Sequence, residues 1–269
     1  MKEQGLKRKP KNSLNSTHSE CPYDQCDGRG LMFTEREDGR AVAIECDCRK
    51  EKIISKKLEF ANIPDKFSGM SIDNFKTNDK SIYKKQQSIE NAMIGKRAAA
   101  NFINKFKRMK QEKKGLYLYS REVGSGKSML ASIIGNELIH KHKAQVKFST
   151  TGDTLNAIRA TYDPVSDVQT HELIEAIREV EVLILDDIGQ DRLKKDTNDK
   201  LYEILNYRSV RKVITIFTSN CRIEELQYDK RIKDRIKKMA IPIHMPEESA
   251  RSNISERDND RLLEELLTS

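Results

Sequence analysis

The sequence has no apolar run long enough to cross a bilayer, and no apolar segment follows its basic first residues, 2–11. A membrane-spanning helix needs about 20 apolar residues, and a secretory signal needs an apolar stretch after its basic start. We therefore expect no membrane association and no export. The sequence predicts a cytoplasmic protein whose residues 1–20 form a flexible basic arm.

Apolar residues are also few, since they make up 36% of the 269 residues while charged residues make up 34%. A chain of this length can still bury one core of domain size and a smaller module. Residues 1–113 hold 25 Lys and Arg against 16 Asp and Glu, whereas the rest of the chain holds 25 against 26. The positive excess is suited to contacts with nucleic acid or an acidic protein, or it simply keeps the surface solvated.

Cysteine is scarce and unevenly placed, because four of the five cysteines fall within residues 21–48. Disulfides are not expected in a chain without an export signal. Two closely spaced pairs predict a zinc-ribbon-like module over residues 21–60, with the metal held by Cys21, Cys26, Cys46 and Cys48. His18 is a further candidate ligand, and the alternative is a set of reduced, unligated thiols in a small β-hairpin.

The pattern changes along the chain. Residues 51–80 carry turn-forming positions and are interpreted as a connector, and residues 61–113 as a linker followed by one or two amphipathic helices. Residues 114–250 alternate apolar strands with amphipathic helices, which predicts an α/β domain with a parallel sheet flanked by helices. The expected strands are 115–120, 144–149, 181–186, 213–219 and 241–245, and the expected helices are 127–142, 153–161, 171–179, 197–209 and 222–239. Residues 251–269 form a helical tail whose acidic, leucine-rich end caps the domain or docks a partner.

The segment Gly124-Ser-Gly-Lys-Ser128 links an apolar strand to a helix and is typical of a P-loop. Its glycines allow backbone N–H groups to surround phosphates, and the helix directs its positive dipole end towards them. The lysine is predicted to reach the β and γ phosphates. Arg121 stands where the full pattern has glycine, which makes the shape of the loop's outer edge an open question. The predicted ATP-binding residues are Gly124, Ser125, Gly126, Lys127, Ser128 and Met129.

Polar side chains follow two other apolar strands. Asp186 and Asp187 come directly after four aliphatic residues, and Asn220 follows the strand that ends near 219. We expect Asp186, together with Ser128, to hold Mg²⁺, and Asp187 to orient or deprotonate the attacking water. Asn220 is suited to bind the γ phosphate or the water, and its alternative role is a helix N-cap.

Taken together, these motifs resemble the DnaC/DnaI-type replicative helicase loaders, a branch of the AAA+ ATPases, in a phage- or mobile-element-like form. The matching segments are Cys46-Asp-Cys-Arg49, Ala61-Asn-Ile-Pro-Asp-Lys-Phe67, the P-loop, Asp186-Asp-Ile-Gly189, Thr218-Ser-Asn220 and Arg231-Ile-Lys-Asp-Arg235. The resemblance implies that Lys127, Ser128 and Asp186 bind MgATP, that Asn220 is sensor 1, and that Arg235 is an arginine finger acting in trans. Arg251 lies where the family carries a sensor 2 arginine.

The resemblance also implies a function: slow, assembly-stimulated ATP hydrolysis that delivers a hexameric DnaB-type helicase to single-stranded DNA. The zinc module would hold the helicase, the ATPase domain would form a homo-oligomer, and DNA would be contacted by Lys147, Thr151 and Arg159. Two alternatives remain open. One is an IstB-like transposition helper ATPase, and the other is a non-catalytic adapter with ATP as a fixed ligand.

Overall fold

The computed structural model describes residues 21–23, 26, 29–35, 40–160, 168–189, 195–211 and 213–268. The chain divides into two compact units, residues 1–57 and residues 58–269. The basic arm predicted for residues 1–20 lies outside the described residues, and so does His18.

The first unit is built on a β-hairpin. Strands β1 (Leu31–Glu35) and β2 (Ala41–Glu45) pair antiparallel. Gly30, just before β1, has φ +81°, and a Cβ there would lie 2.6 Å from the Cβ of Arg49. Its carbonyl oxygen accepts the N–H of Cys46 at 2.9 Å. This tight turn brings the two cysteine pairs to the same end of the hairpin.

Helix α1 (Asp47–Ala61) follows the hairpin directly, so the connector predicted to begin at residue 51 is wrong in its first part. Its fifteen residues contain neither Gly nor Pro, so nothing in them interrupts a helix. The chain leaves the helix at Asn62, which has φ +53° and precedes the turn at Pro64. The turn-forming residues of this region, such as Pro64 and Gly69, all lie after the end of α1 at Ala61.

The second unit contains a five-stranded parallel sheet in the order β4-β5-β6-β3-β7, which confirms the predicted fold class. The strands are β3 (Gly115–Tyr119), β4 (Val146–Thr150), β5 (Val182–Asp186), β6 (Ile214–Ser219) and β7 (Ala240–His244). Strands β5 and β6 are almost wholly buried, as expected for a parallel sheet covered on both faces. The carboxyl ends of β3, β5 and β6 therefore share one edge of the sheet.

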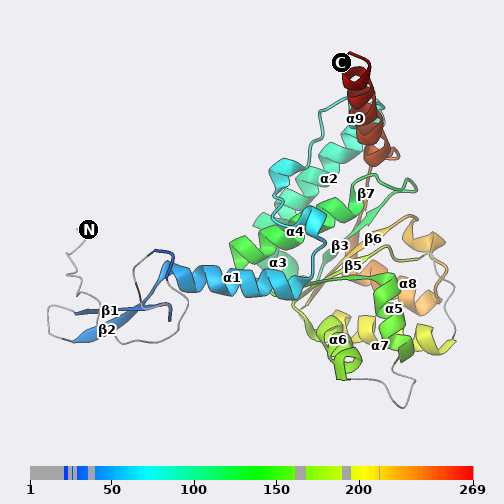
Figure 1. The fold of residues 1–269 in the computed structure, drawn as a ribbon. Helices are drawn as coiled ribbons and strands as arrows, with labels where there is room; N and C mark the ends of the chain where they lie inside the picture. The colour runs from blue at the N-terminus through cyan, green and yellow to red at the C-terminus, as the bar shows by residue number, and fades with distance from the viewer. Residues whose placement is uncertain are drawn as a thin grey trace. The chain divides into compact units, whose positions relative to one another are not determined.

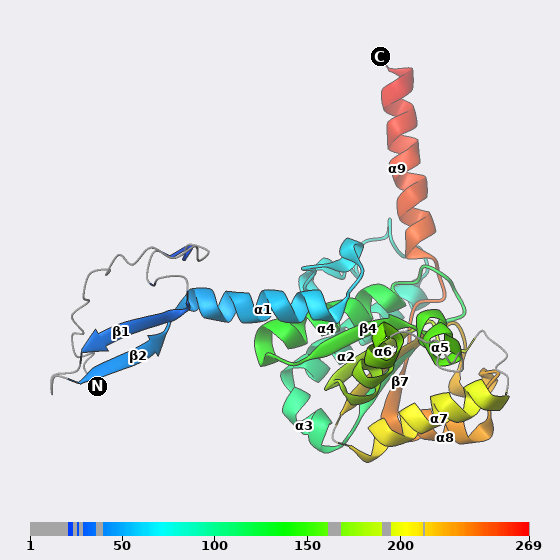
Figure 2. The same ribbon diagram turned by 60° about the horizontal axis from the view of Figure 1, so that its bottom comes forward.

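Helices cover both faces of this sheet (Figures 1 and 2). One face carries α4 (Lys127–His142) and α2 (Gln86–Asn104), which continues into α3 (Phe106–Gln111). The other face carries α5 (Thr151–Ala160), α6 (Val168–Glu179), α7 (Lys195–Val210) and α8 (Lys230–Met239), which share one apolar core. Among the described residues, no helix combines the length and apolarity that crossing a membrane requires.

The helix predicted over 222–239 is wrong in its first half. A short 3₁₀ helix, η3 (Ile223–Glu225), occupies that stretch, and α8 begins only at Lys230. The side chain of Asp229 accepts the N–H of Arg231 at 2.7 Å and so caps α8 at its N-terminus. An Asp at this position starts a new helix, and the segment before it is left free to reach the P-loop.

The last helix, α9 (Ala250–Leu267), leads away from the sheet (Figure 2). The leucines predicted to cap the domain or dock a partner are exposed by 48% to 76%, namely Leu262, Leu263, Leu266 and Leu267. Their face therefore does not cap the domain.

Candidate nucleotide-binding site

The P-loop occupies the turn between β3 and α4, as the sequence predicts. Gly124 and Gly126 have φ of +82° and +97°, a region that side chains disfavour. Both are also packed closely, because a Cβ on Gly124 would lie 2.7 Å from Ser249 Oγ and one on Gly126 would lie 3.0 Å from a ring carbon of Phe75. These two glycines are thus required by conformation and by space.

Lys127 begins α4 and lies almost wholly inside the loop, with 7% of its surface exposed. Its Nζ donates to the carbonyl oxygens of Glu122 at 2.6 Å and Ser120 at 3.2 Å, and to Ser125 Oγ at 3.2 Å. Burial lowers the pKa of Lys127, and the nearby charges of Asp187, Glu247 and Asp186 oppose that shift. The ammonium group and the two strand-end aspartates therefore belong to one electrostatic site.

The carboxylates after β5 are held by the neighbouring strand β6. Thr218 Oγ1 donates to Asp186 Oδ1 at 2.5 Å and accepts the backbone N–H of Asp187 at 2.9 Å. Asn220 Nδ2 donates to Asp187 Oδ1 at 2.9 Å. Asp187 itself has φ +57°, so its side chain turns out of the strand direction. The structure brings the predicted magnesium ligand, water-orienting residue and sensor together at one edge.

Asn220 is not a helix cap, since Arg222 occupies the N-cap position of η3. The side-chain amide of Asn220 instead donates to the carboxylate of Asp187. The geometry therefore favours the site interpretation of Asn220 over the alternative of a cap.

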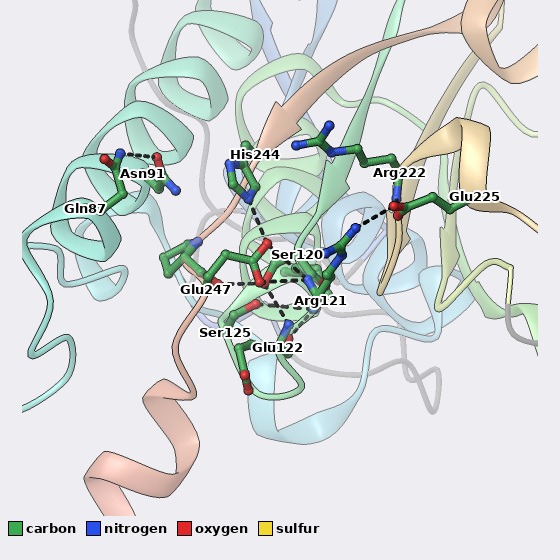
Figure 3. Close-up of polar contacts among 12 residues, drawn as sticks. Gln87, Asn91, Ser120, Arg121, Glu122, Ser125, Arg222, Glu225, His244 and Glu247 are labelled. Carbon is green, nitrogen blue, oxygen red and sulfur yellow. Dashed lines mark hydrogen bonds and ion pairs between the residues drawn. The ribbon is translucent and has the colours of Figure 1, made fainter.

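Arg121 takes its place in the loop with a negative φ, which removes the need for glycine there. Its backbone N–H donates to both carboxylate oxygens of Glu247, at 3.0 and 3.2 Å. Its guanidinium donates to Glu225 Oε1 at 2.6 Å (Figure 3). Two carboxylates from distant segments thus hold the outer edge of the loop.

Two residues of this site, Tyr83 and Glu247, were not predicted from the sequence. Tyr83 is 1% exposed and donates its hydroxyl to the carbonyl oxygen of Ser125 at 3.1 Å. It lies just after the predicted connector, 51–80, in the region interpreted as a linker followed by amphipathic helices. Glu247 follows β7, so the rule that located Asp186 and Asn220 at strand ends could have located it as well.

The two arginines of α8 differ in their surroundings. Arg231 Nη2 pairs with Asp199 at 2.8 Å and with Asp229 at 3.1 Å, and these carboxylates raise its pKa. Arg235 contacts the hydroxyl of Tyr202 at 3.5 Å, and no ion pair of Arg235 is seen among the described residues. Arg231 is exposed and Arg235 is half-buried, but within the described residues only the charge of Arg231 is balanced by ion pairs.

Arg251 lies beside the P-loop, where its backbone N–H donates to the carbonyl oxygen of Gly124 at 3.2 Å and its side chain is exposed. Of the predicted DNA contacts, Thr151 is 1% exposed and donates its hydroxyl to the carbonyl oxygen of Asp186 at 2.9 Å. Lys147 donates to the carbonyl oxygen of Phe60 at 3.1 Å and lies over the Phe60 ring. Arg159 is exposed, so its contact with DNA stays a prediction.

A separate candidate metal site lies in the first unit. The sulfurs of Cys21, Cys26, Cys46 and Cys48 all lie within 4.8 Å of one another, and all four residues are buried. Two of the distances are 3.6 Å (Cys21 to Cys46) and 3.4 Å (Cys26 to Cys48). Four thiolates around a tetrahedral zinc, with bonds of about 2.3 Å, stand about 3.8 Å apart. Burial raises the pKa of the Cys46 and Cys48 thiols and so disfavours their thiolate forms. A bound cation would stabilise these thiolates and offset the effect of burial.

A sequence model of the family described as "IstB-like ATP binding protein" matches residues 40–249. The chain is 25% identical over 201 residues to the uncharacterized protein YqaM of Bacillus subtilis, covering 72% of this chain and 60% of YqaM. It is 27% identical over 155 residues to the replicative helicase loader DnaC of Escherichia coli K12, covering 56% of this chain and 62% of DnaC. The chain thus spans about three fifths of the length of these relatives.

Among solved structures, a crystal structure of DnaI matches 68% of this chain and 94% of its own, with 26% identity and a TM-score of 0.53. These matches confirm the resemblance to DnaC/DnaI-type AAA+ proteins that the motifs indicated.

Proposed function

Because the chain belongs to the family of IstB-like ATP binding proteins, we propose that it is an ATP-dependent loader that places a hexameric replicative helicase of the DnaB type on single-stranded DNA. The protein would load the helicase in the cytoplasm, at the initiation of DNA replication. ATP hydrolysis would act as a switch between holding and releasing the helicase.

The observation that carries the proposal is the convergence of Lys127, Asp186, Asp187 and Asn220 on one sheet edge beside the P-loop. Backbone N–H groups at the start of α4 are suited to phosphate oxygens. Lys127 would leave the carbonyl oxygens it now contacts and bind the β and γ phosphates. Ser128 and Asp186 would hold Mg²⁺, which neutralises phosphate charge during transfer.

The remaining residues orient the reaction. Asp187 would accept a proton from the attacking water or position it, and Asn220 would fix the carboxylate of Asp187. Arg235 would reach the nucleotide of a neighbouring subunit and stabilise charge there, so that hydrolysis depends on the homo-oligomer. Arg251 would contact the nucleotide from the start of α9, and Arg159 would contact single-stranded DNA.

The four-cysteine cluster supports zinc as the metal of the first unit, because four buried sulfurs at these distances suit a closed tetrahedral site. This unit would hold the helicase. The cluster also favours a loader over an IstB-like transposition helper, because such a helper is not expected to carry a cysteine module. Cys21 and Cys26 lie before residue 40, where the match to the family begins, whereas Cys46 and Cys48 lie within it.

The test is a loading assay with purified components on closed circular single-stranded DNA, which a ring helicase cannot enter from an end. We expect wild-type protein with ATP to raise the amount of helicase on the circle, and Lys127→Ala to abolish that gain. Lys105→Ala is the control, since Lys105 is exposed between α2 and α3. Loading of a transposase partner and not of the helicase would favour the transposition helper.

ATP turnover separates the loader from the adapter. A loader should hydrolyse ATP faster when helicase and single-stranded DNA are present. Turnover equal to that of Lys127→Ala under every condition would favour an adapter that keeps ATP as a fixed ligand.

A further inference from the structure

The segment that follows β7 runs along the outer side of the P-loop. The N–H of Met245 donates to the carbonyl oxygen of Tyr119 at 2.8 Å, and Ser120 Oγ donates to the carbonyl oxygen of Pro246 at 2.6 Å. Further along, the N–H of Arg251 donates to the carbonyl oxygen of Gly124. Residues 245–251 therefore follow the loop from its first residue to its glycines.

Glu247 is the one carboxylate of this segment that is bonded to the loop itself (Figure 3). Its two oxygens share the N–H of Arg121, and Oε1 also contacts His244 Nε2 at 2.7 Å. Burial acts to raise the pKa of Glu247, but the hydrogen bonds from His244 and the Arg121 N–H lower it overall. The side chain is therefore an ionised acceptor at neutral pH, fixed from the side of His244 as well as from the loop.

The carboxylate of Glu247 binds the main chain of Arg121 and not its side chain. The guanidinium of Arg121 is directed outward to Glu225 Oε1, and the other oxygen of Glu225 accepts the N–H of Arg222 at 3.0 Å. Among the carboxylates of the described residues, only that of Glu247 accepts the backbone N–H of Arg121.

We propose that Glu247 is a positioning residue for the nucleotide, whose carboxylate keeps the outer edge of the P-loop in the shape that receives phosphates. The inference rests on the proposed ATP-binding function of the loop. Glu247 acts through the backbone of Arg121 and does not touch the reacting atoms.

Two opposing effects decide the outcome of removing this carboxylate. Without the carboxylate, the outer edge of the loop is mobile in the free protein and becomes ordered only when ATP binds. The conformational entropy lost in this ordering weakens the affinity for ATP. Its negative charge also lies near Lys127 and repels phosphates, so its removal strengthens affinity electrostatically. A charge-assisted hydrogen bond to an otherwise unpaired N–H outweighs the repulsion of a carboxylate that is partly open to solvent.

The experiment measures MgATP affinity by calorimetry and steady-state turnover for the full chain. For Glu247→Ala we expect the Kd to rise about tenfold, the worth of one charge-assisted hydrogen bond. For Glu247→Gln, which keeps a neutral acceptor for the same N–H, we expect a smaller rise of about threefold. KM for ATP should rise with Kd while kcat changes little, because the chemical groups are untouched.

Glu248→Gln is the matched control. Glu248 is the neighbouring carboxylate with similar exposure, but it accepts the N–H groups of Lys84 and Lys85 at 2.7 and 3.0 Å. It does not contact the P-loop in the structure, so its substitution should leave the Kd for ATP within about twofold of wild type. Arg121→Ala should also change it little, since the backbone N–H that Glu247 binds remains.

Three results would overturn the inference: unchanged or tighter ATP binding in Glu247→Ala, weakening by Glu248→Gln as large as that by Glu247→Ala, or a fall in kcat with KM unchanged. Thermal unfolding of each variant identifies any that fails to fold, and Glu247→Gln then carries the test. Wild-type protein that binds no ATP would instead refute the proposed function, which is a separate outcome.

Discussion

Asn220 donates its side-chain amide to Asp187 Oδ1 at 2.9 Å, across the ends of two neighbouring strands. Asp187 also receives its backbone orientation from Thr218, which accepts its N–H. The carboxylate predicted to handle water is thus held by β6, the strand that also carries the sensor. Its position is a property of the sheet rather than of the loop that follows β5.

This relationship predicts the effect of Asn220→Ala. We expect ATP turnover to fall about 100-fold, because the carboxylate loses the partner that orients it towards water. MgATP affinity should stay within about threefold, since Lys127 and the backbone N–H groups remain. Asn104→Ala, at the exposed end of α2, is the control with the same side chain removed. Equal loss of affinity and turnover in Asn220→Ala would point to a binding role instead.

A second prediction separates the arginines of α8. Arg235→Ala should lower turnover about 1,000-fold without changing ATP affinity of the single chain, because a finger stabilises charge only during transfer. Arg231→Ala should leave both the unfolding free energy and turnover nearly unchanged, since its ion pairs with Asp199 and Asp229 are exposed.

Mixing variants tests whether Arg235 acts in trans. Arg235→Ala and Lys127→Ala are each expected to be inactive, but a mixed assembly contains interfaces with an intact lysine on one chain and an intact arginine on the other. Turnover should therefore reappear in the mixture. No recovery at any ratio would show that Arg235 serves its own chain or has no part in hydrolysis.

The sequence predicted the sheet edge because each part of it has a local signal. Asp186, Asp187 and Asn220 stand directly after apolar strands, and parallel strands bring such ends together. Glu247 lies beyond the predicted strand 241–245 too, but Met245 and Pro246 separate it from the end of β7 at His244, so it does not follow the strand directly. Tyr83 has no local signal at all, since its burial depends on a P-loop more than forty residues later in the sequence.

The division at Asp229 was missed for a different reason. No Gly or Pro interrupts the chain between Ile223 and Ile236, so its composition allows one long helix, and Ile223, Ile232 and Ile236 are all buried. What breaks the helix is a pair of local caps, Glu225 on the N–H of Arg222 and Asp229 on the N–H of Arg231. Side-chain bonds to the backbone compete with helix continuation here, and the composition of the segment does not reveal them.

A third prediction concerns the cysteine cluster. Purified protein should contain about one zinc per chain, and Cys46→Ser should lose it, because three thiolates bind zinc far less tightly than four. The Cys46→Ser protein should also lose helicase binding. Its affinity for MgATP should stay the same, since the cluster and the P-loop belong to different units. Cys221→Ser is the control, as Cys221 lies outside the cluster. Retained helicase binding by metal-free protein would contradict the assignment of helicase contact to this unit.

A fourth prediction follows from Arg208 of α7, whose side chain has no exposed surface. It donates to the carbonyl oxygens of Ile177, Val180 and Ile214 at 2.9, 2.9 and 2.5 Å, and to Thr215 Oγ1 at 3.0 Å. The first two of these acceptors lie at the end of α6 and just beyond it. Burial lowers the pKa of Arg208 to about 9, so the group is still charged at pH 7 and is solvated by these oxygens instead of water.

Arg208→Met should therefore lower the unfolding free energy by about 3 kcal/mol or more, because several buried acceptors lose their donor at once. Arg208→Lys should recover only part of the lost unfolding free energy. The acceptors lie around the planar guanidinium group of Arg208, and a single ammonium group cannot reach all of them. Arg211→Ala, one turn later and stacked on Tyr207, should cost less than about 1 kcal/mol. Urea unfolding measures all three. Equal losses for Arg208→Met and Arg211→Ala would mean that the oxygens around Arg208 find other donors, and that α6 is fixed to the sheet by its apolar face alone.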